Sequence, residues 1–406
     1  MLKLNHNNGY RTICVGNKRE EMNMKKLTAL LLASVMAIGC LTGCGGGGGN
    51  AGTEGGNKGK GGYEIALVTD KGNIDDKSFN QGAWEGVEAY GKANGIEPHY
   101  YKPEEASDEG YLAAIQLAVD GGAKVVVCPG YLFEVAAYNA QTMFPDVKFI
   151  LLDGEPHTAD GQYKTESNVA CIKYAEEEAG FLAGYAALVE AVADGKATLG
   201  FEGGMAVPAV VAFGYGYLQG IEAAATELGL EDGAVKVFYH YTGDFAETDA
   251  NKITAKNMFK GGAQIVFGCG GSVGKSVFAA AAEHSGKTIG VDVDQKGDSE
   301  TVITSAMKGL GASVQAVLES YYAGTFEADY GGKTTYFAAE NDGVSLPDDY
   351  ERLEKFTKEQ YTTIYAKLVD GSIDPIREFE VAEPVKVTPE ELKTNLNLAK
   401  VVVEKW

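Results

Sequence analysis

The first segment that could do chemistry spans residues 68–86 (VTDKGNIDDKSFNQGAWEG), where a carboxylate and an aromatic ring flank a glycine-containing loop. Asp70 follows an apolar run, and Phe79 begins a helical pattern in which Ser78 has the position of an N-terminal cap. A carboxylate accepts hydrogen bonds from N–H groups, and an aromatic ring offers a flat face for stacking. Taken alone, Asp70 could equally be a turn residue, and Phe79 could be the first core residue of its helix.

Three later positions carry similar chemistry. Phe245 lies in a polar loop, where an aromatic ring is hard to explain as core. Lys308 ends an apolar run, where a solvated lysine is unexpected. Asp292 also follows an apolar run, and its carboxylate can accept hydrogen bonds from two neighbouring hydroxyl groups. We therefore expect Phe245 and Lys308 to serve a binding site.

The elements that must position these residues alternate between short apolar runs and amphipathic segments. Strand-like runs lie near residues 65–68, 99–101, 124–128 and 147–152, with helical patterns between them. The alternation starts again after Asn168 and continues to Val291. Continuous apolar strands between amphipathic helices indicate parallel sheets covered on both faces. The sequence therefore predicts an α/β fold with two doubly wound lobes.

The lobes can be bounded approximately. Residues 63–167 with about 300–330 are assigned to lobe I, and residues 168–299 to lobe II. The tail, residues 331–406, cannot be assigned to either lobe from its pattern. Ligands of doubly wound sheets bind beyond the carboxyl ends of the strands, so the segments that follow the strands should form the site.

The N-terminus predicts export. A basic stretch at residues 24–26 precedes an apolar run at 27–39, and Thr42 and Gly43 precede Cys44. The apolar run is shorter than the roughly 20 residues of a membrane span. We therefore expect a lipoprotein signal with Cys44 as the lipid acceptor, and Cys40 is the weaker alternative.

Residues 1–43 are thus interpreted as leader and signal peptide. Residues 1–21 do not fit a signal, and Met22 or Met24 is a better start. Residues 44–62 form the lipidated cysteine and a glycine-rich tether that cannot bury a core. We expect acyl chains to hold the mature chain at the extracytoplasmic face of the cell membrane.

Charge and cysteine usage exclude several classes of partner. The net charge of −22 argues against nucleic acid, which is a polyanion. Cys128, Cys171 and Cys269 have no metal-ligand spacing and are interpreted as small buried apolar side chains. Neither a metal site nor a cofactor is expected. Residues 270–276 suggest a phosphate-binding loop, but Cys269 stands where its first glycine is required.

Five further motifs follow the first segment in chain order: 149–154 (FILLDG), 179–184 (AGFLAG), 241–245 (YTGDF), 289–295 (IGVDVDQ) and 304–308 (TSAMK). Together the six motifs resemble the basic membrane protein family of ABC transporter substrate-binding lipoproteins, whose best-understood members bind purine nucleosides. The resemblance covers residues 63 to about 318. It implies a fold like the first type of periplasmic binding protein, in which the chain crosses between lobes several times.

The resemblance also implies how a base would be held. Phe79 and Phe245 match the two rings that sandwich the base, and Asp70 and Asp153 match the carboxylates that read its edge. Carboxylates accept from ring N–H and amino groups, which favours guanosine or inosine, and adenosine is the third candidate ligand. Lys71 departs from the family, because some nucleoside binders have asparagine there.

The ribose contacts match three more positions, Gly271, Asp292 and Lys308. Glycine lets the backbone approach a ligand closely. Asp292 can accept from two hydroxyl groups and Lys308 can donate to one. An uncharged nucleoside also has no phosphate for this acidic chain to repel.

The sequence therefore predicts a monomeric substrate-binding lipoprotein that carries a purine nucleoside to an ABC permease and has no catalytic residues. A secreted metal-dependent nucleoside hydrolase is one alternative, and it would release free base. A sensor that presents its ligand to a membrane receptor is a second. A sugar-binding protein of related fold is a third.

Overall fold

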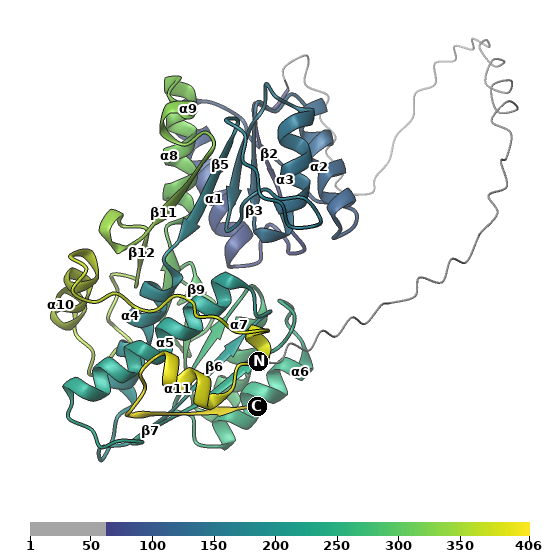
Figure 1. Cartoon of the computed structure of the whole chain (residues 1–406). Helices are drawn as coiled ribbons and strands as arrows, with labels where there is room; N and C mark the ends of the chain where they lie inside the picture. The colour runs from purple at the N-terminus through teal and green to yellow at the C-terminus, as the bar shows by residue number, and fades with distance from the viewer. Residues whose placement is uncertain (1–61) are drawn as a thin grey trace, which may run out of the picture. The chain divides into compact units, whose positions relative to one another are not determined.

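The structure, a computed structural model, describes residues 62–406 (Figure 1). The predictions for the signal peptide, Cys44 and the tether before Gly62 lie outside these residues. Two sheets, each covered by helices on both faces, make up the described chain. The two doubly wound lobes of the predicted α/β fold are therefore confirmed.

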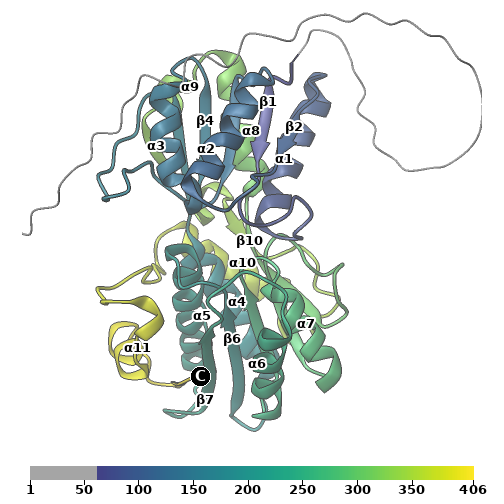
Figure 2. The ribbon, with the colours of Figure 1, turned by 90° about the vertical axis from the view of Figure 1, so that its right-hand side faces the viewer.

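The first sheet has six strands, and every neighbouring pair in it is parallel. In spatial order its strands are β11 (Lys333–Phe337), β5 (Val169–Tyr174), β4 (Lys148–Leu152), β3 (Val125–Pro129), β1 (Ile65–Val68) and β2 (His99–Tyr101). Its helices are α1 (Phe79–Asn94), α2 (Asp108–Asp120), α3 (Glu134–Met143), α8 (Leu310–Ala323) and α9 (Phe326–Asp329). Helices α1 and α8 pack together on one face, and α2 and α3 pack on the other (Figures 1 and 2).

The second sheet has seven strands, and only β12 runs antiparallel to its neighbour. In spatial order its strands are β12 (Val344–Ser345), β10 (Val302–Lys308), β9 (Lys287–Asp292), β8 (Ile265–Cys269), β6 (Ala197–Gly203), β7 (Val235–Tyr241) and β13 (Val401–Lys405). Its helices are α4 (Glu176–Ala191), α5 (Pro208–Glu227), α6 (Asp249–Lys260), α7 (Val273–His284), α10 (Lys358–Val369) and α11 (Pro389–Asn395).

Helices α4 and α5 pack closely enough to explain one of the sequence motifs. A Cβ atom added to Gly180 would lie 2.2 Å from the carbonyl oxygen of Phe213, and one added to Gly184 would lie 2.1 Å from that of Tyr217. Only glycine permits this backbone approach. The motif at residues 179–184 is therefore a helix-packing motif.

Within the described residues the chain crosses between the two sheets three times, at Ala175, at Gly309 and at residues 338–343. The crossovers are bonded to one another. Gly309 N donates to Gly343 O at 2.8 Å, and Ala175 N donates to Phe337 O at 3.0 Å. The three crossover segments, called the hinge from here on, are thus joined to one another by backbone hydrogen bonds.

The lobe boundaries differ from the predicted ones. Strand β10 was assigned to lobe I, but it pairs with β9 in the second sheet, and only the following helix α8 returns to the first. Strand β5 follows Asn168 and was assigned to lobe II, but it pairs with β4 in the first sheet. Strands of both sheets have the same apolar composition, so local sequence does not encode which sheet a strand joins.

The tail divides between the lobes. Strand β11 completes the first sheet, whereas β12 and β13 are the two edges of the second. The cysteine interpretation is confirmed, because Cys128, Cys171 and Cys269 are fully buried and unpaired.

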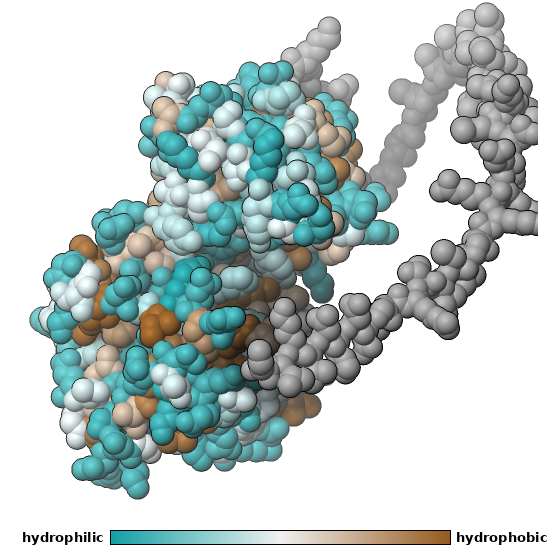
Figure 3. All heavy atoms as spheres, in the orientation of Figure 1, coloured by the Kyte–Doolittle hydropathy of each residue, from teal (hydrophilic) through white to brown (hydrophobic). Residues whose placement is uncertain are grey.

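No helix within residues 62–406 has the length and apolar character that crossing a membrane requires. The face seen in Figure 3 is mainly hydrophilic, and apolar residues appear as separate patches, chiefly over the second lobe.

One carboxyl group is buried in the second lobe without a partner. Phe201 packs toward α5, so strand alternation turns the next residue, Glu202, toward the other face of the sheet. Glu202 is fully buried, and neither carboxyl oxygen has a hydrogen-bond partner among the described residues. Burial raises the pKa of Glu202 to about 8. The folded protein therefore holds this group protonated at neutral pH.

We predict that Glu202→Gln stabilises the protein increasingly as the pH rises. A folded-state pKa above the unfolded value costs stability once the unfolded group ionises, so wild type weakens between about pH 4.5 and pH 8. At about pH 8.5 the variant should be more stable by roughly 2–4 kcal/mol, and near pH 4.5 the two should coincide. Thermal unfolding across pH measures this, with exposed Glu104→Gln as the control. A constant difference at all pH values would contradict the assignment.

Candidate functional site

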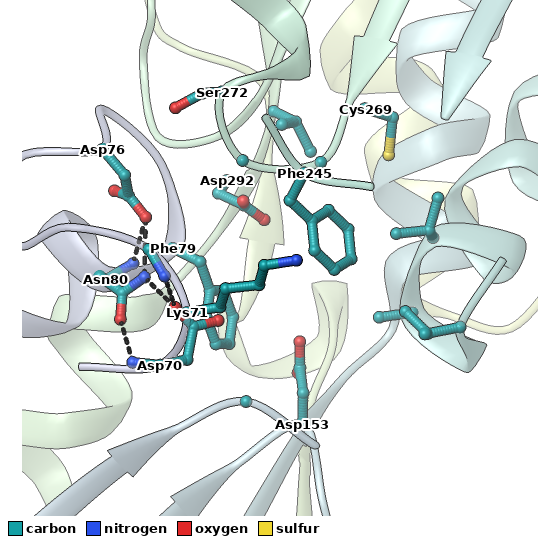
Figure 4. Close-up of a pocket in the computed structure, with 18 of the residues that line it drawn as sticks. Asp70, Lys71, Asp76, Phe79, Asn80, Asp153, Phe245, Cys269, Ser272 and Asp292 are labelled. Atoms are coloured by element: carbon teal, nitrogen blue, oxygen red, sulfur yellow. Dashed lines mark hydrogen bonds between the residues drawn. The ribbon is translucent and has the colours of Figure 1, made fainter. Parts of the chain in front are cut away.

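The carboxyl ends of strands from both sheets surround one cavity of about 520 Å³. All seven predicted ligand residues line it, although they come from both lobes. Those from the first lobe are Asp70, Phe79 and Asp153, and those from the second are Phe245, Gly271, Asp292 and Lys308. Figure 4 shows the side chains of several of them turned into this cavity.

Phe245 is held by glycines that leave room for its ring. A Cβ atom on Gly204 would lie 2.5 Å from the ring, and one on Gly270 would lie 3.1 Å from it. At Gly271 the backbone is left-handed (φ +51°), and a Cβ atom there would lie 3.2 Å from Cβ of Phe245. The structure thus gives Gly271 a packing role that the sequence reasoning did not identify.

Two carboxylates occupy unusual backbone positions at the ends of strands. Asp153 follows β4 with φ +56°, and Asp292 ends β9 with φ +68°. The left-handed region costs a non-glycine residue about 1–2 kcal/mol. Such strain persists only where contacts with the surrounding structure force the backbone into this conformation, which is common at ligand sites.

Lys308 lies in a charged and aromatic cage. Its Nζ is 2.5 Å from Oδ2 of Asp153 and 2.9 Å from Oε1 of Glu176. Three aromatic rings surround the ammonium group at 4.9–5.4 Å, those of Phe79, Tyr174 and Phe213. Burial alone would lower the pKa of Lys308, but Asp153, Glu176 and Asp292 raise it well above its ordinary value. The lysine is therefore a fixed cation.

Asp153 uses only one of its oxygens. Oδ2 accepts from Lys308, whereas Oδ1 is buried and has no hydrogen-bond partner within residues 62–406. Burial raises the pKa of Asp153 to about 7 against the opposing effect of Lys308. A donor on a bound molecule would satisfy Oδ1 and favour the ionised carboxylate.

The N-terminus of α1 is capped by a residue other than the predicted one. Ser78 has the cap position, but its side chain makes no cap hydrogen bond and instead donates to Oδ2 of Asp292. Asp76 caps the helix, because its carboxylate accepts from the backbone N–H groups of Ser78, Asn80 and Gln81. Ser78 therefore has the predicted cap position, but the capping hydrogen bonds come from Asp76.

Asp70 is held by the same loop. Its Oδ1 accepts from Gly72 N at 2.6 Å and from Nδ2 of Asn80 at 2.7 Å (Figure 4). No described residue donates to Oδ2. Burial raises the pKa of Asp70, which the bonds from Gly72 and Asn80 oppose. One acceptor of Asp70 is therefore still available.

Sequence reasoning missed three residues that support the site: Asn80, Glu176 and Arg377. Asn80 bridges Asp70 and Asp76, and Glu176 pairs with both Lys308 and Arg377. The only signal for Glu176 was a carboxylate at the start of a helix whose later residues are mostly buried and apolar. Arg377 lies far along the chain, and nothing local marks it.

No group of three or more His, Cys, Asp or Glu side chains within residues 62–406 is arranged to hold a metal ion.

Comparison with known proteins identifies relatives over most of the chain. A family model described as "ABC transporter substrate-binding protein PnrA-like" (Bmp) matches residues 64–373. The "ABC transporter nucleoside-binding protein BmpA" of Lactococcus lactis is 29% identical, with 86% of this chain and 98% of the relative covered. An "Uncharacterized lipoprotein" of Pyrococcus abyssi is 28% identical, with 93% and 98% covered.

A solved structure agrees with the architecture. The crystal structure of an ABC transporter solute-binding protein from Aeropyrum pernix has a TM-score of 0.68 at 22% identity, and covers 82% of this chain and 99% of that chain. The likeness shows a two-lobed fold of the periplasmic solute-binding type.

Proposed function

Because the chain belongs to the Bmp family of PnrA-like ABC transporter substrate-binding proteins, we propose that it binds a purine nucleoside in the cavity between its sheets and delivers it to an importer. The observation that carries the proposal is the lining of one cavity by two aromatic rings from different lobes, Phe79 and Phe245, beside carboxylates with free acceptors. Its volume of about 520 Å³ is within the ordinary range for small-ligand sites.

The ribose is assigned to Asp292 and Lys308. An ammonium group has three N–H donors, and two of those on Lys308 face Asp153 and Glu176. The third is left for a ribose hydroxyl. Asp292 accepts from Ser78 through Oδ2, so Oδ1 remains for a second hydroxyl.

The base edge is assigned to Asp70, Asp153 and Lys71. Lys71 lines the cavity, and Figure 4 shows its side chain reaching across it toward Phe245. No described residue forms a hydrogen bond or ion pair with its ammonium group. A 6-oxopurine has an N–H donor beside a carbonyl acceptor, which suits a carboxylate beside an ammonium group. Adenine has the opposite order, so we infer a preference for guanosine or inosine.

The proposal also places the chain at the extracytoplasmic face of the cell membrane, held by acyl chains on Cys44. The sequence pattern of residues 24–44 supports this, and a relative is named a lipoprotein. Closure of the lobes around the nucleoside would present a surface for docking on an ABC permease.

We predict that calorimetric titration detects one purine nucleoside per chain. Phe79→Leu should weaken binding about tenfold or more, because stacking on an aromatic ring contributes roughly 1–3 kcal/mol. Tyr163→Leu, which removes an exposed ring outside the cavity, is the matched control. Cytidine and ribose should bind much more weakly. Absence of binding to every nucleoside would contradict the proposal, and free base in the recovered samples would indicate a hydrolase.

We further predict that Lys71 determines which purine is preferred. Lys71→Met should weaken inosine and guanosine binding about tenfold, the effect of one charged hydrogen bond, and leave adenosine binding nearly unchanged. Lys77→Met is the control, because Lys77 is exposed in the same loop but does not line the cavity. Equal losses for all three nucleosides would show that Lys71 does not read the base.

A further inference from the structure

Arg377 contacts both sides of a hinge crossover from a C-terminal segment that lies beyond the cavity lining. Its Nη1 donates to Tyr174 O at 2.7 Å and to Oε2 of Glu177 at 2.6 Å, and its Nη2 is 2.6 Å from Oε2 of Glu176. Tyr174 ends β5 in the first sheet, whereas Glu176 and Glu177 begin α4 in the second lobe. The guanidinium group therefore contacts residues on both sides of the first crossover.

The segment that carries Arg377 is anchored on the second lobe. Ile376 N donates to Oε1 of Gln219 at 2.8 Å, and Nε2 of Gln219 donates back to Ile376 O at 2.9 Å. Gln219 belongs to α5. On the other side the guanidinium group lies 5.8 Å from the ring of Tyr336 in β11. Arg377 is thus fixed between the lobes.

Glu176 connects this arginine to the ligand site. Its side chain is only 1% exposed, and its two oxygens face two cations, with Oε1 toward Lys308 and Oε2 toward Arg377. Burial would raise the pKa of Glu176, but Lys308 and Arg377 hold it below its ordinary value. A buried carboxylate that loses one of two cations takes up a proton more readily.

We propose that Arg377 is a positioning residue, which keeps Glu176 ionised and oriented toward Lys308. Through Glu176 it holds the ammonium group of Lys308 in position for the ligand and connects that ammonium group to the hinge. The ligand part of this inference rests on the proposed function. The effect on Glu176 does not, because it concerns the folded protein alone.

The test compares Arg377→Gln with Arg352→Gln. Arg352 is a matched control because its side chain is 22% exposed against 23% for Arg377. It also donates to backbone carbonyl groups, and it does not line the cavity. The Kd ratio of Arg377→Gln to wild type should rise from about twofold near pH 8 to about tenfold near pH 5.5, since Glu176 then gains a proton. For Arg352→Gln the ratio should stay near one.

A second readout needs no ligand. Thermal unfolding of Arg377→Gln should show a larger loss of stability near pH 8 than near pH 5.5, because an underpaired buried carboxylate is costly only while it is ionised. Adding Glu176→Gln should remove that pH dependence, and Arg377→Lys, which keeps a cation, should show little of it.

The outcomes separate two failures. If wild type binds no nucleoside while the unfolding data show the predicted pH dependence, the proposed function fails and the role of Arg377 toward Glu176 stands. If Arg377→Gln behaves like Arg352→Gln in both binding and thermal unfolding, the positioning role is refuted. It is also refuted if the stability losses caused by Arg377→Gln and Glu176→Gln simply add in the double variant.

Discussion

The site depends on a single buried cation, the ammonium group of Lys308. Burying an ion pair removes both of its charges from water, which is costly. The cost is recovered only where the two charged groups lie close together in a favourable geometry. Here Asp153 and Glu176 lie at 2.5 and 2.9 Å, on opposite sides of the first hinge crossover. Deleting the cation would leave Asp153 without a cationic partner and Glu176 with Arg377 alone. Its position therefore constrains both lobes and the hinge between them.

The hinge joins the lobes, and the closure proposed for ligand binding requires that it also permits movement. Its three crossovers are bonded to one another through backbone groups at Ala175, Gly309 and Gly343. Backbone hydrogen bonds between short segments can be kept while the flanking dihedral angles change, as in hinge closure of other two-lobed binding proteins. Ligand groups between Phe79 and Phe245 would then favour the closed arrangement by contacting both lobes.

The sequence predicted much of this arrangement where the signal was local. The start of helix α1 at Phe79 was predicted correctly, because a loop, a cap position and an apolar period coincide there. Non-local features were missed. The sheet that β10 joins depends on pairing across the fold, and the hydroxyl of Ser78 bonds to Asp292, 214 positions away, instead of its own helix. Arg377 carried no local signal at all.

A crystal structure of the protein grown with guanosine would test the proposed binding site. We expect the base to lie between the rings of Phe79 and Phe245, with ribose hydroxyl groups within hydrogen-bond distance of Asp292 and Lys308. Lys308 should also keep its contact with Glu176 in the complex. A nucleoside bound outside the cavity, or in it with neither ring against the base, would contradict the proposed binding site.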